Sequence, residues 1–139
     1  MTVQDVFDMA IHLMDEQNES TGATVTADTQ EYKFRTISIL NTAIPVLYKY
    51  SSDYDGDGDP HSVLLLHEDY QNPDLAQEIP LDDSLCAALL PLYLAAQLLA
   101  AENESLSAWF LSRYQMVFQD IRTKTARSFE PISTPYGLF

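Results

Sequence analysis

The stretch from Leu81 to Arg122 reads LDDSLCAALLPLYLAAQLLAAENESLSAWFLSRYQMVFQDIR, and it decides the fold. Its apolar residues recur with the 3.6-residue period of an α-helix, and the polar residues 102–104 interrupt them. Asp82 or Asp83 is suited to cap the first helix, because a carboxylate accepts bonds from the free N–H groups at a helix start. The stretch therefore predicts two helices joined by a short turn, which together form the core as a helical hairpin.

The first of these two helices is apolar on more than one side. Leu85, Leu89 and Leu92 lie on one face, and Leu94 and Leu98 make the opposite face apolar too. A helix that is apolar all round is buried on all sides, either in a core or against partners. It is too short and too interrupted for a membrane span. We predict that one face holds the domain together while Leu94 and Leu98 contact a neighbouring copy.

Further helical patterns lie on both sides of this core helix. Thr2 and Asp5 have the spacing of a capping box that opens a short helix ending near Glu16. A longer helix is predicted from about residue 29 to residue 50, and Pro45, which lacks a backbone donor, should kink it near Asn41. The second helix of the hairpin has its apolar stripe at Leu106, Trp109, Phe110, Val117 and Ile121. We expect a mainly α fold, a small antiparallel bundle of about four helices that forms a domain over residues 1–124.

Two segments lie outside the predicted helices. In the insert at about residues 51–80, an apolar run at 62–67 and a second extended segment at 76–79 predict a short β-hairpin or an extended loop. Because an isolated hairpin is only marginally stable, it needs cover from the helices or from another chain. Residues 125–139 are predicted to form an extended tail. Its apolar residues Tyr136, Leu138 and Phe139 either fold back on the domain or dock on a partner.

The sequence SSDYDGDGDPH contains the sharpest short motif of the chain. Asp53, Asp55 and Asp57, followed by a glycine, match the first half of an EF-hand calcium loop. The bidentate Glu of such a loop should stand at its twelfth position, which is Leu64 here. Alternating Asp and Gly are also typical of a solvated turn. We expect no metal or cofactor, and these residues with Asp59 are a weak calcium candidate.

The formal net charge of −14 is unevenly distributed over the 139 residues. Residues 1–32 contain seven acidic residues and residues 51–83 contain ten, with no Lys or Arg in either segment. Four of the seven basic residues lie in the last quarter, at Arg113, Arg122, Lys124 and Arg127. This polarity permits head-to-tail contacts between copies, which close into a ring or continue as a filament. The charge opposes non-specific nucleic-acid binding, and it also serves solubility.

No catalytic arrangement emerges from the sequence. Cys86, the single cysteine, lies in the apolar helix and is predicted to be a small buried hydrophobe. The histidines are not arranged with Cys86 or with a serine in any recognisable pattern. The first residues lack the positive region and long apolar run of a signal peptide, so an intracellular protein is the expectation. We therefore expect assembly or recognition rather than enzyme activity.

The order of these features resembles the head–tail connector (adaptor) proteins of tailed bacteriophages and prophages. A short helix of the type TVQDVFDMAIHLMDE is followed by a polar loop and the helix EYKFRTISILNTAIPVLY. After the acidic insert come PLDDSLCAALLPLYLAAQLLAAENESLSAWFLSRYQMVF, with the pair Arg113-Tyr114, and a tail with EPISTPYG. The resemblance covers most of the chain, although the DGDGD insert departs from the family pattern.

The resemblance implies a structural virion protein of the head–tail junction, made in the bacterial host cytoplasm. Such subunits form a ring, typically of twelve copies, that joins the portal protein to the next head-closure or tail protein of the neck. Acidic segments would face the channel and let DNA pass without specific binding, and the tail would reach the portal. The alternative from the residues alone is an acidic DNA mimic that inhibits a nucleic-acid-binding protein, because its charge imitates phosphate.

Overall fold

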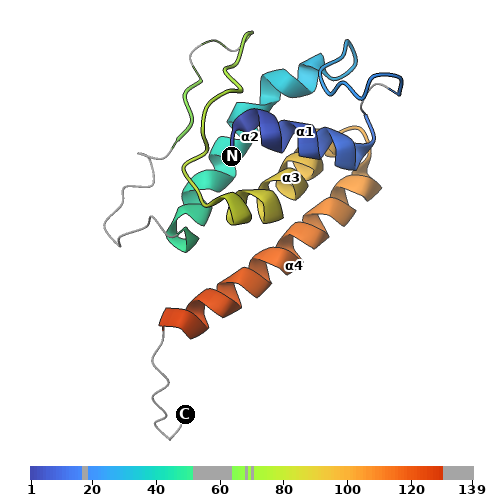
Figure 1. The fold of residues 1–139 in the computed structure, drawn as a ribbon. Helices are drawn as coiled ribbons and strands as arrows, with labels where there is room; N and C mark the ends of the chain where they lie inside the picture. The colour runs from blue at the N-terminus through green and yellow to red at the C-terminus, as the bar shows by residue number, and fades with distance from the viewer. Residues whose placement is uncertain (17–18, 52–63, 68, 70, 130–139) are drawn as a thin grey trace, which may run out of the picture.

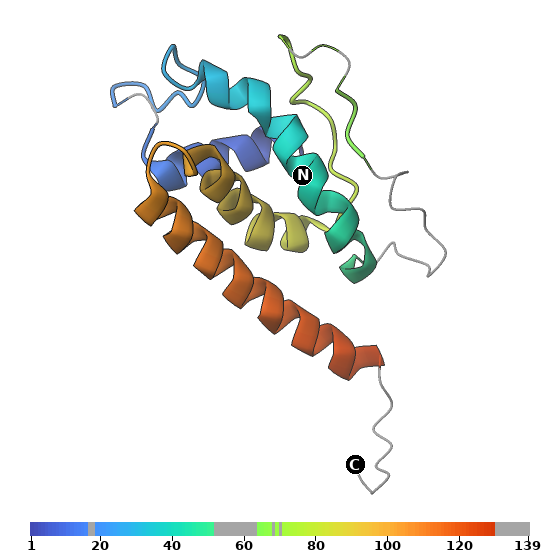
Figure 2. The ribbon, with the colours of Figure 1, turned by 180° about the vertical axis from the view of Figure 1, so that it is seen from behind.

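The computed structural model describes the chain apart from residues 17–18, 52–63, 68, 70 and 130–139, and for residues 125–129 it describes the backbone alone. Within these limits four α-helices pack together: α1 (Val3–Met14), α2 (Gln30–Leu47), α3 (Asp83–Leu99) and α4 (Glu104–Phe129). A 3-10 turn, η1 (Tyr48–Tyr50), continues α2. Helix α3 lies in the middle and contacts the other three helices (Figures 1 and 2). The prediction of a mainly α bundle of four helices is confirmed.

Helix α1 begins with the predicted capping box. The Thr2 hydroxyl accepts a bond from the Asp5 N–H (3.2 Å), and the Asp5 carboxylate accepts one from the Thr2 N–H (2.9 Å). Backbone bonds then join this end of the chain to the segment before α3, from Val3 N–H to the Gln77 carbonyl and from Ile79 N–H to the Met1 carbonyl (both 3.0 Å). The start of α1 is therefore fixed both by its own cap and by a short extended pairing.

Helix α3 is buried round most of its circumference, as its composition predicts. Its buried side chains are those of Leu85, Cys86, Leu89, Leu90, Pro91, Leu94, Ala95, Ala96, Leu98 and Leu99. Leu94 is 0% exposed and Leu98 1% exposed, because α1, α2 and α4 together cover the helix. The prediction that these two leucines contact a neighbouring copy is wrong for this fold, since the chain itself leaves them no free surface.

Helix α4 runs back along α3 and continues past the rest of the bundle (Figures 1 and 2). Phe110 and Tyr114 are the buried side chains of α4 up to residue 124, and the Ser107 hydroxyl donates to the Ala96 carbonyl (2.7 Å) at the start of the helix. Trp109 was predicted on the inward stripe, but it is 55% exposed because Phe110 takes the inward position. The helix extends to Phe129, beyond residue 124 where the sequence placed the end of the helical domain.

The predicted β-hairpin is absent from the described part of the insert, which is an extended loop. Side-chain amides occupy the positions that a partner strand would take. The Asn41 amide accepts a bond from the Leu65 N–H (2.8 Å) and donates one to the Leu65 carbonyl (3.1 Å). The Gln77 amide makes the same pair of bonds with Leu66 (2.8 and 2.7 Å). The loop is thus held by two side chains instead of a backbone ladder.

Candidate interaction surfaces

The residues that the sequence proposed as partner contacts are widely separated. Arg113, Arg122 and Lys124 are exposed on α4, whereas Leu94 and Leu98 lie in the core. Arg127 belongs to the last turns of α4, where the structure describes the backbone alone. Outside the described residues lie both the tail residues and the candidate calcium ligands: Tyr136, Leu138, Phe139, Asp53, Asp55, Asp57 and Asp59.

The cations of α4 lie on the surface with their charges accessible. The Arg113 guanidinium lies 5.7 Å from the centre of the Trp109 ring, and that of Arg122 lies 5.8 Å from the Phe118 ring. Lys124 Nζ is 3.3 Å from a carboxylate oxygen of Asp120, one helical turn away, and both groups are exposed. Exposed pairs of this kind contribute at most about 1 kcal/mol and leave the charges accessible to a partner.

A row of aromatic rings fixes α4 where it leaves the bundle. The ring of Tyr114 lies 5.2 Å from that of Tyr93 on α3 and 5.9 Å from that of Phe118. Phe118 in turn meets Tyr50 of η1 edge to face, with ring centres 5.5 Å apart. Burial and the neighbouring Tyr93 raise the pKa of the Tyr114 hydroxyl to about 12. From Gln119 to Lys124 the helix side chains are exposed, except that Ile121 is half-buried.

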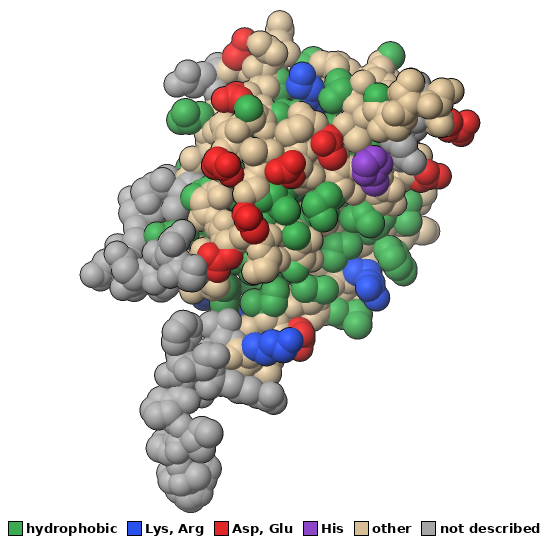
Figure 3. Space-filling view, viewed as in Figure 1, with side chains coloured by type: hydrophobic (Ala, Val, Ile, Leu, Met, Phe, Trp, Pro, Cys, Tyr) green, Lys and Arg blue, Asp and Glu red, His purple; other side chains and the backbone are tan. Residues whose placement is uncertain are grey.

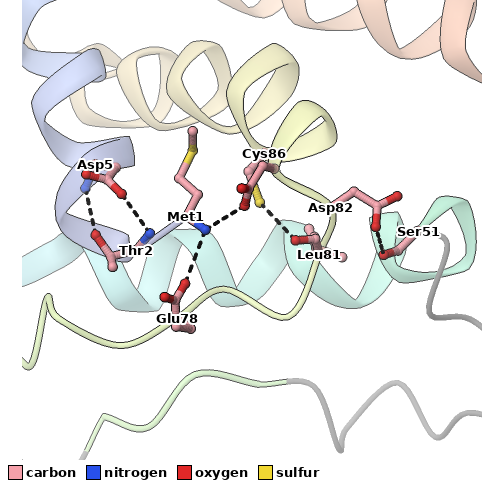
Figure 4. A network of polar contacts seen from close by, with 9 residues as sticks. Met1, Thr2, Asp5, Ser51, Glu78, Leu81, Asp82 and Cys86 are labelled. Atoms are coloured by element: carbon pink, nitrogen blue, oxygen red, sulfur yellow. Dashed lines mark hydrogen bonds and ion pairs between the residues drawn. The ribbon is translucent and has the colours of Figure 1, made fainter.

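Acidic side chains gather on the body of the bundle, away from the cations at the end of α4 (Figure 3). Part of this group surrounds the amino end of the chain (Figure 4). The Met1 ammonium lies 2.6 Å from the Asp83 carboxylate and 3.1 Å from that of Glu78, and both carboxylates are largely exposed. These hydrogen bonds raise the pKa of the Met1 amine to about 10. The acids therefore hold the amine and still present negative charge to solvent.

The start of α3 differs from the predicted carboxylate cap. Asp82 stands at the N-cap position, but its side chain makes no capping hydrogen bond. It accepts a bond from the Ser51 hydroxyl (3.2 Å; Figure 4), and Asp83 binds the Met1 ammonium. Both carboxylates therefore bind side-chain or terminal donors from other parts of the chain, which the local sequence pattern does not reveal.

The outward face of α4 has a different character. We call it the α4 strip; its members are exposed, uncharged and separated by steps of three and four residues: Ser105, Trp109, Ser112, Met116, Gln119 and Thr123. Trp109 is 55% exposed and Met116 63% exposed. A shallow hollow runs along part of this face, with Ser112, Met116 and Gln119 among its lining residues. The strip is therefore a continuous surface that can accept another element.

Cysteine thiols and clusters of His, Cys, Asp or Glu are the groups that enzymes and metal sites most often use. Cys86 is buried, as predicted, and its thiol points at the Leu81 carbonyl (3.7 Å; Figure 4). Burial raises the pKa of this thiol to about 11, so it is protonated at neutral pH and unreactive. Among the described residues, no three His, Cys, Asp or Glu side chains come close enough to hold a metal.

Over the same residues, no helix has the length and hydropathy that crossing a membrane requires.

Several structural contacts have no signal in the sequence. Asn41 and Gln77 hold the insert through bonds to residues 24 and 11 positions away. The Tyr32 hydroxyl donates to the Glu102 carboxylate, which joins the start of α2 to the turn between α3 and α4. Burial and this carboxylate raise the pKa of Tyr32. Contacts of such long range follow from the packed fold, so periodicity and spacing do not predict them.

None of the protein-family models, curated proteins or solved structures compared with the chain matches it. We therefore infer the function from three surfaces of the molecule and from the resemblance in the sequence. Those surfaces are the acid-rich body, the cations of α4 and the uncharged α4 strip.

Proposed function

We propose that this chain is a structural subunit of a phage or prophage virion, which forms an oligomeric ring between the portal and the neck or tail. It acts by assembly, without catalysing a reaction. The observation that carries the proposal is the separation of charge: the body is rich in acids, while Arg122 and Lys124 lie on the part of α4 beyond Phe118. The sequence resemblance to head–tail connectors supports the same role.

Charge separation favours one class of contact. A heterologous contact joins two different surfaces, so copies repeat in the same orientation and close into a ring when the rotation permits. The exposed carboxylates Glu78 and Asp83 on the body and the exposed cations on α4 are two such complementary surfaces. The contact that we propose brings the cations of one copy to the acids of the next.

The net charge also suits a ring around DNA. A wall of negative charge repels phosphate and keeps a passing duplex from sticking, since phosphate neutralisation dominates non-specific binding. With a formal net charge of −14, the chain offers few cations to such a duplex. We propose that acidic segments line the channel, while the cations of α4 are paired with carboxylates of the neighbouring copy.

The test measures assembly of the full chain, alone and mixed with the portal protein of the same phage or prophage, by native mass spectrometry. We expect a ring of defined copy number on the portal, which Arg122→Glu combined with Lys124→Glu abolishes and added salt weakens. Lys33→Glu combined with Lys49→Glu makes the same change in net charge on α2 and η1, and it should leave the ring intact. A chain that remains monomeric with and without portal would overturn the proposal, as would equal effects of the two double variants.

A second candidate is an acidic DNA mimic, which the gathering of acids on one face favours (Figure 3). This reading requires a nucleic-acid-binding partner that duplex DNA displaces from the immobilised chain. Apolar side chains such as Met9 and Leu13 are also exposed on α1, and they have no counterpart on a phosphate backbone. We therefore favour the ring subunit, and displacement by duplex DNA decides between the two.

A further inference from the structure

The α4 strip, from Ser105 to Thr123, lies opposite the side of α4 that packs in the bundle. The inward side carries the buried rings of Phe110 and Tyr114. Successive residues of a helix turn by 100°, so Met116 points almost directly away from Tyr114. The strip is about 27 Å long at 1.5 Å per residue, and it includes two large exposed apolar side chains. It therefore takes no part in packing the chain's own core.

The spacing of the α4 strip is that of a helix-pairing seam. Steps of four and three residues repeat along it, from Ser105 to Trp109 and on to Ser112, Met116, Gln119 and Thr123. This repeat keeps side chains on one line facing a partner helix, as positions a and d of a heptad do. Trp109, Met116 and Thr123 take position a, and the other three residues take position d. The natural occupant of such a seam is another helix.

We propose that the part of the α4 strip from Ser112 to Thr123 binds the same part of a second copy's strip in antiparallel orientation. The twofold axis passes between Met116 and Gln119, so that each of these residues faces the other across the contact. Ser112 of one copy then lies opposite Thr123 of its partner copy. This contact goes beyond the proposed ring, which uses the cations at the end of α4 and the acids of the body.

Charge complementarity favours a second copy as the occupant and sets the orientation. Arg113 and Asp120 both flank the seam on the same side, at position e of successive heptads. Antiparallel pairing places position e opposite position e, so Arg113 of each copy faces Asp120 of the other. One pair of residues thus supplies two ion pairs about the axis. In parallel pairing, position e faces position g, where the chain has Ala108 and Gln115, and neither ion pair forms.

The shape of the subunit fits this arrangement. Helix α4 continues past the other helices after Phe118, so the second half of the paired span lies on the projecting part of the helix (Figures 1 and 2). The contact joins identical patches, so it is isologous and stops at two copies. Met116 is the one large exposed apolar side chain of each copy within Ser112–Thr123, so the contact lies at the small end of specific interfaces and we expect weak, concentration-dependent pairing.

The experiment measures self-association of the full chain by sedimentation equilibrium over a range of concentrations. Arg113→Asp sets acid against acid in both ion pairs, and Asp120→Arg sets base against base. We expect either change alone to weaken pairing at least tenfold, and the double exchange to restore it to within about threefold. Lys33→Asp and Asp28→Arg change the net charge equally but lie outside α4, and they should leave pairing unchanged. Circular dichroism checks that every variant keeps its helices.

A cross-link then reports the orientation. Cys86 is buried, so an added surface cysteine is the reactive one. A mixture of the Ser112→Cys and Thr123→Cys variants should form the mixed disulfide in preference to either homodimer. A chain that stays monomeric at all concentrations, a double exchange that fails to restore pairing, or a preference for the Ser112→Cys homodimer each overturns the proposal. The ring on the portal is tested separately, with the Arg122→Glu and Lys124→Glu double variant. Failure of one proposal therefore leaves the other intact.

Discussion

Replacing Asn41 by alanine should release the insert from α2. The substitution removes both amide bonds to Leu65, a residue that is 6% exposed, so its backbone N–H and carbonyl are left with poor access to water. A hydrogen bond contributes about 1 kcal/mol net, and an unsatisfied buried group costs about 1–3 kcal/mol. We expect Asn41→Ala to lower the free energy of unfolding by about 2–4 kcal/mol, a large part of the roughly 5–15 kcal/mol available to a domain.

Urea unfolding followed by far-ultraviolet circular dichroism measures this loss. The chain's one tryptophan, Trp109, is 55% exposed, so its fluorescence would report the core poorly. Hydrogen exchange should show that the Leu65 amide loses its protection while α3 keeps its own. Asn72→Ala removes an exposed amide from the same insert and should change stability by less than about 0.5 kcal/mol. Equal effects of Asn41→Ala and Asn72→Ala would refute the reasoning.

Two further predictions concern the core and the amino end. Leu94→Ala should destabilise the isolated chain by about 2–5 kcal/mol in urea unfolding, because it opens a cavity in a site that is 0% exposed; a stable variant that only fails to assemble would contradict the burial. The pKa of the Met1 amine is about 10 in the folded chain, above its ordinary value of 8.0, so the ion pairs stabilise the fold below pH 8 and this contribution is lost as pH rises through 10. We measure the free energy of unfolding at a series of pH values from 7 to 11. It should decrease less over this range for Glu78→Gln than for the unaltered chain.

The sequence predicts those parts of the fold that depend on neighbouring residues. The capping box of Thr2 and Asp5 acts over three positions, and the structure contains both of its bonds. The break at residues 102–104 separates α3 from α4, because polar residues interrupt the apolar period there. Apolar residues all round α3 predict a central helix, which is what the structure shows. In each case the pattern and its physical cause lie within one or two helical turns.

Other features depend on residues far apart in the chain, and the sequence does not reveal them. The apolar run near Leu65 satisfies the pattern of a strand, but the Asn41 and Gln77 side chains supply its partners. Trp109 and Phe110 are adjacent aromatic residues, and only packing against α3 decides that Phe110 turns inward. Asp82 and Asp83 fit a helix cap, yet donors from Ser51 and the amino end bind them instead. The type of a side chain determines which groups it can bind, whereas the packing of distant segments determines which of those groups lies within reach.

The burial of Leu94 and Leu98 changes the grounds for oligomerisation. The excess of leucine on α3 was one reason to expect a contact between copies, but three neighbouring helices account for it completely. Hydrophobicity of the core helix is therefore no argument for assembly. The contacts that we propose use α4 and the acid-rich body instead: the cations of α4 meet the acids of another copy, and the uncharged α4 strip meets a second α4.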